Sequence, residues 1–395
     1  MKKPIFPTFG NKNVRLYYIL TIFLSANFIL PNWVFYFGRF ISIPAIGLID
    51  GLSKIVAVVL EVPSGAVSDL LGKKKTLIMG NMFFALCSIV LINAATFTTL
   101  LIGNMIMFVG FAFLSGAKEA ILYDTLIDIN KEDHYDEVLG RVSTIAIVTT
   151  IVTIFTGGFL YSIKPELTFW AWLVWSLLAI VTLLFMDEPK ADDGELTYGQ
   201  YFSKLKSGTK SIFQKSFMKF TLPVLFFAML IKSYEGVIRQ NTGAYFGFDG
   251  ETFGYLMAII TIPTLLISYN FGRIVKTLKE RTEYVFMALY LLGFLIVYVT
   301  NNMIFGVASF LSIYAAQELA KPFIISMVNK NTDSKHRATA LSTVSLFSEI
   351  PYMIVVIFFG FLLEVDSIAY LYLAFAVAVV IYGLVAITNR RHSKK

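Results

Sequence analysis

Ionisable side chains inside long apolar segments are the residues of this sequence best placed to do chemistry. An ionised group in a bilayer costs at least ~2.5 kcal/mol on insertion scales, so it indicates either a function or a paired charge. A carboxylate in such surroundings can be neutralised by a proton, which makes it a candidate proton carrier. The candidates for proton coupling are Glu119, Glu235, Glu318 and Glu349.

The apolar segment 218–246 carries three charged residues at helical spacing. Lys232 and Glu235 are three residues apart, and Arg239 lies four residues further on. In one continuous helix these spacings put all three side chains on the same face. We expect the bases to keep Glu235 ionised until a conformational change moves one of them. The alternative is a permanent ion pair that only holds the helix in place.

A second charged stripe lies in the apolar segment 44–67. On a helix, Asp50, Lys54 and Glu61 fall within about 40° of one another. Asp50 and Lys54 have the i,i+4 spacing of an ion pair. A functional and a structural explanation of this stripe are equally open.

Twelve apolar segments position these residues. The chain of 395 residues is 57% hydrophobic and 15% charged, whereas soluble proteins carry about 25% charged residues. Each segment is close to the ~20 residues that a transmembrane helix needs. The expected spans are 14–37, 44–67, 75–95, 99–127, 141–162, 167–186, 218–246, 253–272, 282–300, 303–328, 337–363 and 367–388.

A polar stretch with spaced lysines divides these spans into two groups of six. The predicted domains are an N-terminal six-helix bundle at 1–187, a cytoplasmic linker at 188–217 and a C-terminal six-helix bundle at 218–395. The two halves resemble each other: the loop Ser68–Lys73 matches Ser268–Arg273, and Glu119 has a counterpart in Glu318. The sequence therefore predicts an all-α membrane protein of twelve transmembrane helices in two pseudo-symmetric bundles.

The basic residues gather in every second loop. Only Arg39 and Lys164 lie in the loops of the other side. By the positive-inside rule, this asymmetry predicts a multi-pass protein of the cell membrane with both termini in the cytoplasm. The net charge of +7 is explained by these loops, so no nucleic-acid partner is expected.

Residues for enzymatic or metal chemistry are sparse. The three histidines, His134, His336 and His392, fall in predicted loops or the tail, and Cys87 is the only cysteine. The phosphate-binding pattern G-x-x-x-x-G-K-[ST] does not occur, which argues against an ATP-driven pump. We therefore expect no enzyme activity, no cofactor and no metal.

A motif between the second and third segments carries a family resemblance. The run Gly65–Lys75 fits G-x-x-x-D-x-x-G-[RK]-[RK], and it resembles the signature of the major facilitator superfamily. The resemblance implies that family's fold and transport by alternating access. It also implies a gate in which Asp69 docks at the start of the eleventh span, near Arg337. The gating residues are Gly65, Asp69, Gly72, Lys73, Lys74 and Arg337.

The resemblance is nearest to the drug/proton antiporter branch, with two departures. The fourth span reads Gly103-Asn104-Met105 and lacks that branch's arginine, and the fifth-span signature is reduced to Gly157-Gly158. The second half also has Tyr269 where the first has Asp69. The motifs therefore indicate the superfamily more strongly than the antiporter branch or any particular substrate.

In that family the first, fourth, seventh and tenth helices line a central cavity. The substrate-binding candidates on these helices are Asn27, Lys118, Glu119, Tyr123, Lys232, Tyr234, Glu235, Arg239 and Glu318. The resemblance also implies that Glu318 is the partner of Glu235 across the cavity. For any single tyrosine, ordinary packing is a better explanation than contact with a ligand.

The sequence as a whole predicts a monomeric secondary transporter whose partners are a small-molecule substrate, protons and the lipid bilayer. Its mixed charges and aromatic rings suggest proton-coupled export of an amphiphilic or charged organic compound. The alternatives are proton-coupled uptake of a small polar solute and a receptor that does not transport.

Overall fold

The computed structural model describes residue 8 and residues 10–190, 215–278, 281–331, 337–364 and 367–393. Throughout these ranges the regular structure is helical, and no strand occurs in them. The chain divides into two compact units, which we describe separately. Unit 1 comprises residues 1–41 and 52–198, and unit 2 comprises residues 42–51 and 199–395. Most of the predicted linker, 188–217, lies outside the described residues.

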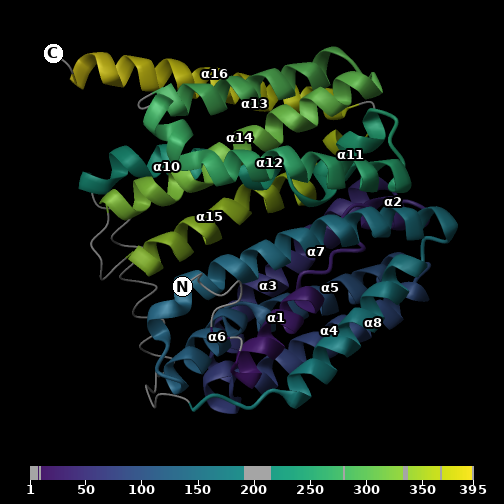
Figure 1. Ribbon diagram of the computed structural model, residues 1–395. Helices are drawn as coiled ribbons and strands as arrows, with labels where there is room; N and C mark the ends of the chain where they lie inside the picture. Colours follow the sequence, from purple (N-terminus) through teal and green to yellow (C-terminus); the bar gives the residue numbers. More distant parts are fainter. Residues whose placement is uncertain are drawn as a thin grey trace. The chain divides into compact units, whose positions relative to one another are not determined.

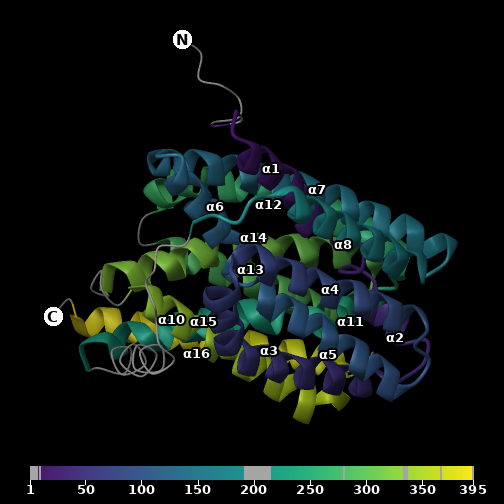
Figure 2. The ribbon, with the colours of Figure 1, turned by 90° about the horizontal axis from the view of Figure 1, so that it is seen from below.

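The helices of unit 1 follow the first six predicted segments (Figure 1). They are α1 (Lys12–Leu24), α2 (Trp33–Phe37), the part of α3 (Ile43–Leu71) from residue 52 onward, α4 (Lys73–Ile92), α5 (Phe97–Leu114), α6 (Ala117–Asp128), the short η1 (Glu132–His134), α7 (Tyr135–Ile163) and α8 (Leu167–Phe185). Helix α4 packs against both α5 and α8, as the turned view also shows (Figure 2).

Two of the predicted spans in unit 1 are interrupted. The span 14–37 is divided into α1 and α2, and the span 99–127 into α5 and α6 at Ser115–Gly116. In the first interruption, the backbone N–H of Asn27 donates to the Thr153 hydroxyl at 3.0 Å. Gly157 faces the same turn, and a Cβ there would lie 2.2 Å from the Phe28 carbonyl oxygen. A small residue in α7 is therefore what lets the broken helix approach.

Unit 2 contains the remaining helices and the first part of α3. They are α10 (Lys215–Ser233), α11 (Gly236–Tyr245), α12 (Gly250–Leu278), α13 (Thr282–Val299), α14 (Met303–Asn331), α15 (Arg337–Phe358), the short η4 (Gly360–Leu363) and α16 (Ile368–Ser393). Residues 43–51 of α3 pack on α15, where Gly47 meets Val356 and Gly51 meets Ile357.

Nine helices in the described part of the chain are long and apolar enough to cross a membrane by length and composition. Two shorter apolar helical stretches, Pro223–Lys232 and Phe347–Phe358, add to these. Together with the pair α1 and α2, they correspond to the twelve predicted segments, and this agreement supports the predicted fold class.

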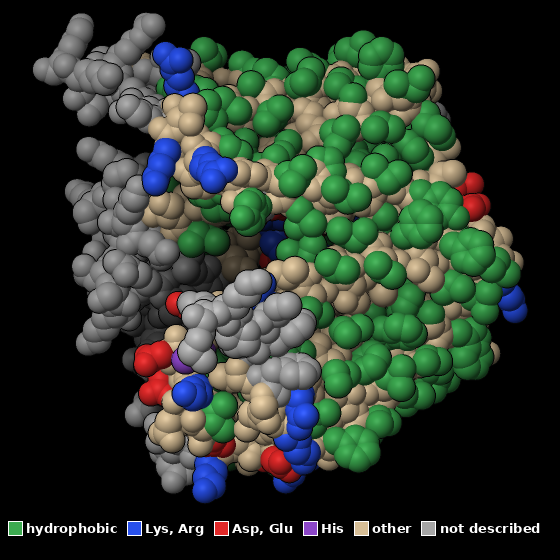
Figure 3. Space-filling view, viewed as in Figure 1, with side chains coloured by type: hydrophobic (Ala, Val, Ile, Leu, Met, Phe, Trp, Pro, Cys, Tyr) green, Lys and Arg blue, Asp and Glu red, His purple; other side chains and the backbone are tan. Residues whose placement is uncertain are grey.

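The outer surface fits a lipid environment. On α8 the exposed side chains Trp170, Val174, Leu177, Val181 and Leu184 recur every three or four residues, which places them on one helix face. Hydrophobic side chains cover much of the face drawn in Figure 3. A soluble protein rarely exposes apolar side chains so continuously.

Candidate functional site

A break in the seventh span organises the charged residues of unit 2. Helix α10 ends at Ser233, and Glu235 is the N-cap of α11, with extended backbone angles. The prediction of one continuous helix over 218–246 is therefore wrong. The physical reason is Gly236, whose φ of +54° is a left-handed conformation that glycine adopts at little cost.

The break brings one base against two acids. The Lys232 ammonium lies 2.7 Å from a carboxylate oxygen of Glu349 on α15 and 3.5 Å from one of Glu235. The side chains of Lys232, Glu235 and Glu349 are 28%, 33% and 18% exposed, so solvent or a ligand can still reach them. One ammonium neutralises only one of the two carboxylates. As ionised groups, the three carry a net charge of −1.

Arg239 does not share this ion pair. Its guanidinium donates to the Tyr314 hydroxyl at 3.1 Å, and that hydroxyl donates to the sulfur of Met257 at 3.3 Å. The expected face shared by Lys232, Glu235 and Arg239 does not form, because the break turns α11 away from the register of α10. The buried Nε of Arg239 has no hydrogen-bond partner in the described structure, so this cation has capacity left for another acceptor.

Glu318 and Tyr234 contact residues other than Lys232. Glu318 pairs with Lys321, one turn along α14, at 3.0 Å, whereas Glu235 pairs with Lys232. Tyr234 is 1% exposed and packs against the rings of Tyr314 and Tyr372, with centroids 6.3 and 6.0 Å away. Their predicted contacts with substrate stay predictions.

The unit 1 candidates group around the two interrupted spans. Lys118 and Glu119 are adjacent at the start of α6, with 3.4 Å between their charged atoms, and each is about half exposed. Tyr123 makes an edge-to-face contact with Tyr135 at 5.2 Å. The Asn27 side chain donates to the Ser25 carbonyl at 3.0 Å, so it helps to hold the first interruption.

The gating motif is fixed within unit 1 by two of its lysines. Gly72 has a positive φ, +93°, between α3 and α4. Lys73 pairs with Asp124 of α6 at 3.3 Å. Asp69 is exposed, and the side chain of Arg337 lies outside the described residues, so their docking stays a prediction. Gly65 is also exposed, and a Cβ added there would meet no atom within 4 Å.

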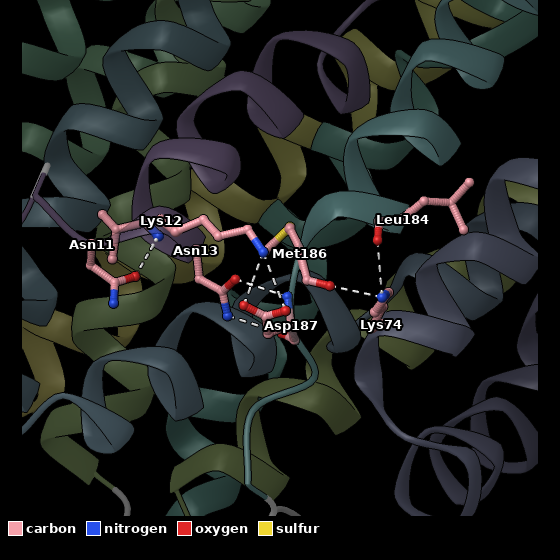
Figure 4. Close-up of polar contacts among 8 residues, drawn as sticks. Asn11, Lys12, Asn13, Lys74, Leu184, Met186 and Asp187 are labelled. Carbon is pink, nitrogen blue, oxygen red and sulfur yellow. Dashed lines mark hydrogen bonds and ion pairs between the residues drawn. The ribbon is translucent and has the colours of Figure 1, made fainter.

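One end of unit 1 is held together by contacts that the motif alone does not indicate (Figure 4). Lys74 donates from its ammonium to the Met186 carbonyl at 2.7 Å, which satisfies an acceptor at the end of α8. Asn13 and Asp187 exchange two hydrogen bonds of 2.9 Å, and Lys12 pairs with Asp187 at 3.1 Å. The acidic residues directly after the sixth span were the available sequence signal for this closure.

No group of three or more His, Cys, Asp or Glu side chains that could hold a metal ion occurs among the described residues.

Comparison with known proteins gives a consistent result along the whole chain. The family model described as "Major Facilitator Superfamily" matches residues 16–238 and 236–395. A tetracycline resistance protein, class H, of Pasteurella multocida is 21% identical over 98% of this chain and 97% of its own length. Multidrug resistance protein 1 of Bacillus subtilis is 23% identical, covering 66% of this chain and 67% of its own length.

Solved structures resemble the fold more closely than the sequence. A mutant of the nucleoside transporter NupG aligns with a TM-score of 0.78 at 14% identity, over 95% of this chain and 99% of that one. A D-xylose–proton symporter aligns with a TM-score of 0.66 at 12% identity, over 94% of each chain.

Proposed function

The chain belongs to the major facilitator superfamily, and from this premise we propose that it exports an amphiphilic or charged organic compound in exchange for protons. Family membership makes it a multi-pass membrane transporter of small molecules and not an enzyme. The direction of transport, the proton and the class of substrate are the proposed part.

The observation that carries the proposal is the sharing of Lys232 between Glu235 and Glu349. Two carboxylates close to one ammonium repel each other, so a further positive charge stabilises this group of three residues. A proton on one carboxylate supplies that charge, and so does a cationic substrate. Competition between proton and substrate for the same carboxylates produces antiport without further machinery.

Two features support the substrate class. Aromatic rings of Tyr234 and Tyr314 lie beside Arg239, so apolar surface and charge occur together, as amphiphilic ligands require. The curated relatives that are named for tetracycline and multidrug resistance also favour export.

Purified protein in liposomes tests the proposal directly. An imposed pH gradient should drive accumulation of labelled tetracycline or of ethidium in the parent. Glu235→Gln and Glu349→Gln should each abolish that dependence while exchange down the substrate's own gradient continues. Glu318→Gln is the comparison variant, because its carboxylate pairs with a separate base, Lys321; loss of gradient dependence in this variant alone would assign the exchanged proton to Glu318. Retained gradient dependence in both Glu235→Gln and Glu349→Gln would contradict the proposal and leave Glu119 and Glu318 as the remaining carriers.

Proton-coupled uptake of a small polar solute is the second candidate. The solved structures of similar fold include nucleoside, peptide and sugar transporters, and this observation favours it. The same liposomes distinguish the two directions. A gradient that is acidic outside drives uptake by symport, whereas antiport accumulates substrate when the interior is acidic. A receptor without transport activity would show neither.

The orientation follows from the basic loops and is open to a separate test. Reporters placed after residue 395 and near Ser207 should report a cytoplasmic position, and one near Asp249 an external position. A monomer is expected, and the mass of the detergent-purified protein measures it. An external C-terminus would contradict the twelve-span topology.

The gate is the last part of the proposal. Asp69 is exposed at the end of α3, where it can accept hydrogen bonds from the start of another helix. Asp69→Asn should slow transport and leave thermal stability close to the parent. Transport at the parental rate in this variant would exclude the latch.

A further inference from the structure

Two hydrogen-bond donors beside the break in the seventh span lack an acceptor. The Nε–H group of Arg239 and the hydroxyl of Tyr234 are both buried, and neither has a hydrogen-bond partner in the described structure. Tyr234 directly precedes Glu235, the N-cap of α11, and Arg239 lies in the first turn of that helix. A buried donor without an acceptor costs free energy, so two of them at one place indicate that an acceptor is missing there.

Aromatic rings surround these two donors. Another N–H group of the Arg239 guanidinium donates to the Tyr314 hydroxyl at 3.1 Å, and the guanidinium also interacts electrostatically with Tyr234. The ring of Tyr234 has its centroid 6.3 Å from that of Tyr314, 6.0 Å from that of Tyr372 and 5.8 Å from that of Phe310. The donors therefore lie in mostly apolar surroundings, where an unused charge-assisted hydrogen bond is strong.

Arg239 is also a cation without an acid of its own. Among the described residues it forms no ion pair with a carboxylate, and the Tyr314 hydroxyl that accepts its hydrogen bond donates onward only to the sulfur of Met257, a weak acceptor. The acid that acts on it electrostatically is Glu235, whose ion-pair partner is Lys232. An anion is therefore the partner that this place lacks.

The backbone at the start of α11 already has a partner from the protein. The Tyr352 hydroxyl of α15 accepts a hydrogen bond from the Val237 N–H at 3.2 Å and donates one to the Asp50 carboxylate. A Cβ at Gly236 would lie 2.2 Å from this hydroxyl, so the contact is close. This part of the helix N-terminus is occupied, which leaves the two side-chain donors as the place for an anion.

We propose that the Nε–H group of Arg239 and the hydroxyl of Tyr234 bind a monovalent anionic group, such as a carboxylate, inside unit 2. Both groups donate to the same anion, and neither has to give up an existing hydrogen bond to do so. The aromatic rings favour an organic or weakly hydrated anion over a strongly hydrated one such as sulfate.

An anion at this site also changes the Lys232 group one turn away. The positive charge of Arg239 acts on Glu235, and a bound anion cancels that charge. The repulsion between Glu235 and Glu349 is then less compensated, so a positive charge binds there more tightly. A zwitterionic substrate satisfies both places at once, and in this step the inference rests on the proposed function. A free inorganic anion is the other source of the same chemistry.

Equilibrium dialysis of labelled benzoate against the full-length protein in detergent measures the site without reference to transport. The parent should bind benzoate in sodium sulfate buffer, and Arg239→Gln should bind it about tenfold more weakly or worse. Tyr234→Phe should weaken binding by about threefold or more. Because this hydroxyl has no hydrogen-bond partner, Tyr234→Phe without benzoate should unfold at the parental temperature or higher, so its result does not depend on how well Arg239→Gln folds.

Tyr290→Phe is the matched control. It removes another buried hydroxyl that has no hydrogen-bond partner in the described structure, this one on α13. Unlike Tyr234, this residue has no contact with Arg239 that would place its hydroxyl at the proposed site. Its affinity for benzoate should equal that of the parent.

Probes that carry different charges distinguish the two sources of the anion. The zwitterion para-aminomethylbenzoate should bind the parent about tenfold more tightly than benzoate or benzylammonium if the anionic group belongs to the substrate, and Arg239→Gln should lose this advantage. Chloride that displaces benzoate, with no advantage for the zwitterion, would assign the site to a free inorganic anion.

Two results would overturn the anion site: a parent that binds neither benzoate nor chloride, or benzoate affinities that are the same in Tyr234→Phe and Tyr290→Phe. Gradient-driven accumulation in liposomes is scored separately. Its absence from the parent would refute the proposed antiport, whereas dialysis alone decides whether Arg239 and Tyr234 bind an anion.

Discussion

The acids of the two units are paired with bases in different ways. In the described ion pairs of unit 1, each acid has a base of its own: Lys12 with Asp187, Arg39 with Glu166, and two further pairs. In unit 2, Glu318 also has a base of its own, Lys321, but Lys232 serves both Glu235 and Glu349. In a one-to-one pair the two charges cancel, whereas two carboxylates beside one ammonium repel each other, and a proton or a cationic substrate can relieve that repulsion. The exchangeable charge is therefore expected in unit 2.

Removing the shared base should have the largest effect. Lys232→Met leaves Glu235 and Glu349 without their ammonium, so one of them should remain protonated and proton exchange should stop. We expect gradient-driven accumulation to fall by about tenfold or more, which corresponds to a loss of at least ~1.4 kcal/mol of coupling. Lys12→Met breaks an exposed pair of unit 1 and should transport almost like the parent. Equal losses in both variants would remove the contrast between the units.

The left-handed glycine at the break comes next. In Gly236→Ala, the new methyl group meets the Tyr352 hydroxyl at 2.2 Å and the positive φ becomes strained. Together these effects should cost about 3 kcal/mol of stability, read as a lower unfolding temperature in detergent. Gly272→Ala, in helix α12 with open space around it, is the control and should be neutral or stabilising. Similar unfolding temperatures for the two variants would contradict the packed geometry of the break.

A smaller effect is expected from the tyrosine that accepts from Arg239. Tyr314→Phe removes the acceptor of a half-buried guanidinium and should destabilise the protein by about 1.5 kcal/mol. Tyr123→Phe in unit 1 keeps the ring contact with Tyr135, so its unfolding temperature should stay near that of the parent. If the two substitutions had equal effects, the hydroxyl of Tyr314 would not hold Arg239.

The smallest effect concerns pH and the loop pair of unit 1. Burial by itself raises the pKa of Glu166, but hydrogen bonds from backbone and from Arg39, with the charges of Arg39 and Lys164, lower it overall from its usual 4.5. A lowered pKa in the folded state means that the pair stabilises the fold above pH 4.5 and that this stability is lost as the pH falls through the folded value.

Arg39→Gln should therefore lower the free energy of unfolding near neutral pH by no more than ~1 kcal/mol, as for other pairs at a protein surface, and this is measured as a lower unfolding temperature. The difference from the parent should shrink in acid. A difference that grew as the pH fell would have the wrong sign for this pair.

Hydropathy was enough to predict the apolar helices of the chain. The apolar lengths locate the spans, because a bilayer requires about 20 apolar residues regardless of the partners of a helix. The positive φ of Gly72 was also predictable from the turn between two adjacent spans. Such features depend on local composition.

The partners of the charged residues at the break depend instead on residues far away in the sequence. Lys232 and Glu235 are neighbours in the sequence, yet the shorter ion pair of Lys232 is with Glu349 on another helix. Helical spacing placed Arg239 beside Glu235, but one left-handed residue changed the register and gave Arg239 the Tyr314 hydroxyl. Helical spacing predicts which side chains share a face only while the helix is continuous. The predicted neighbours of Arg239 are therefore wrong, because this residue follows the break.

The bond between Tyr352 and Asp50 also constrains how the protein is made. The two residues are separated by 302 positions, so Asp50 enters the membrane long before Tyr352 is synthesised. During that interval the nascent second span carries an acid that still lacks this partner, and insertion is easiest if the acid is protonated. The hydrogen bond between Tyr352 and Asp50 can therefore form only after the eleventh span has been synthesised.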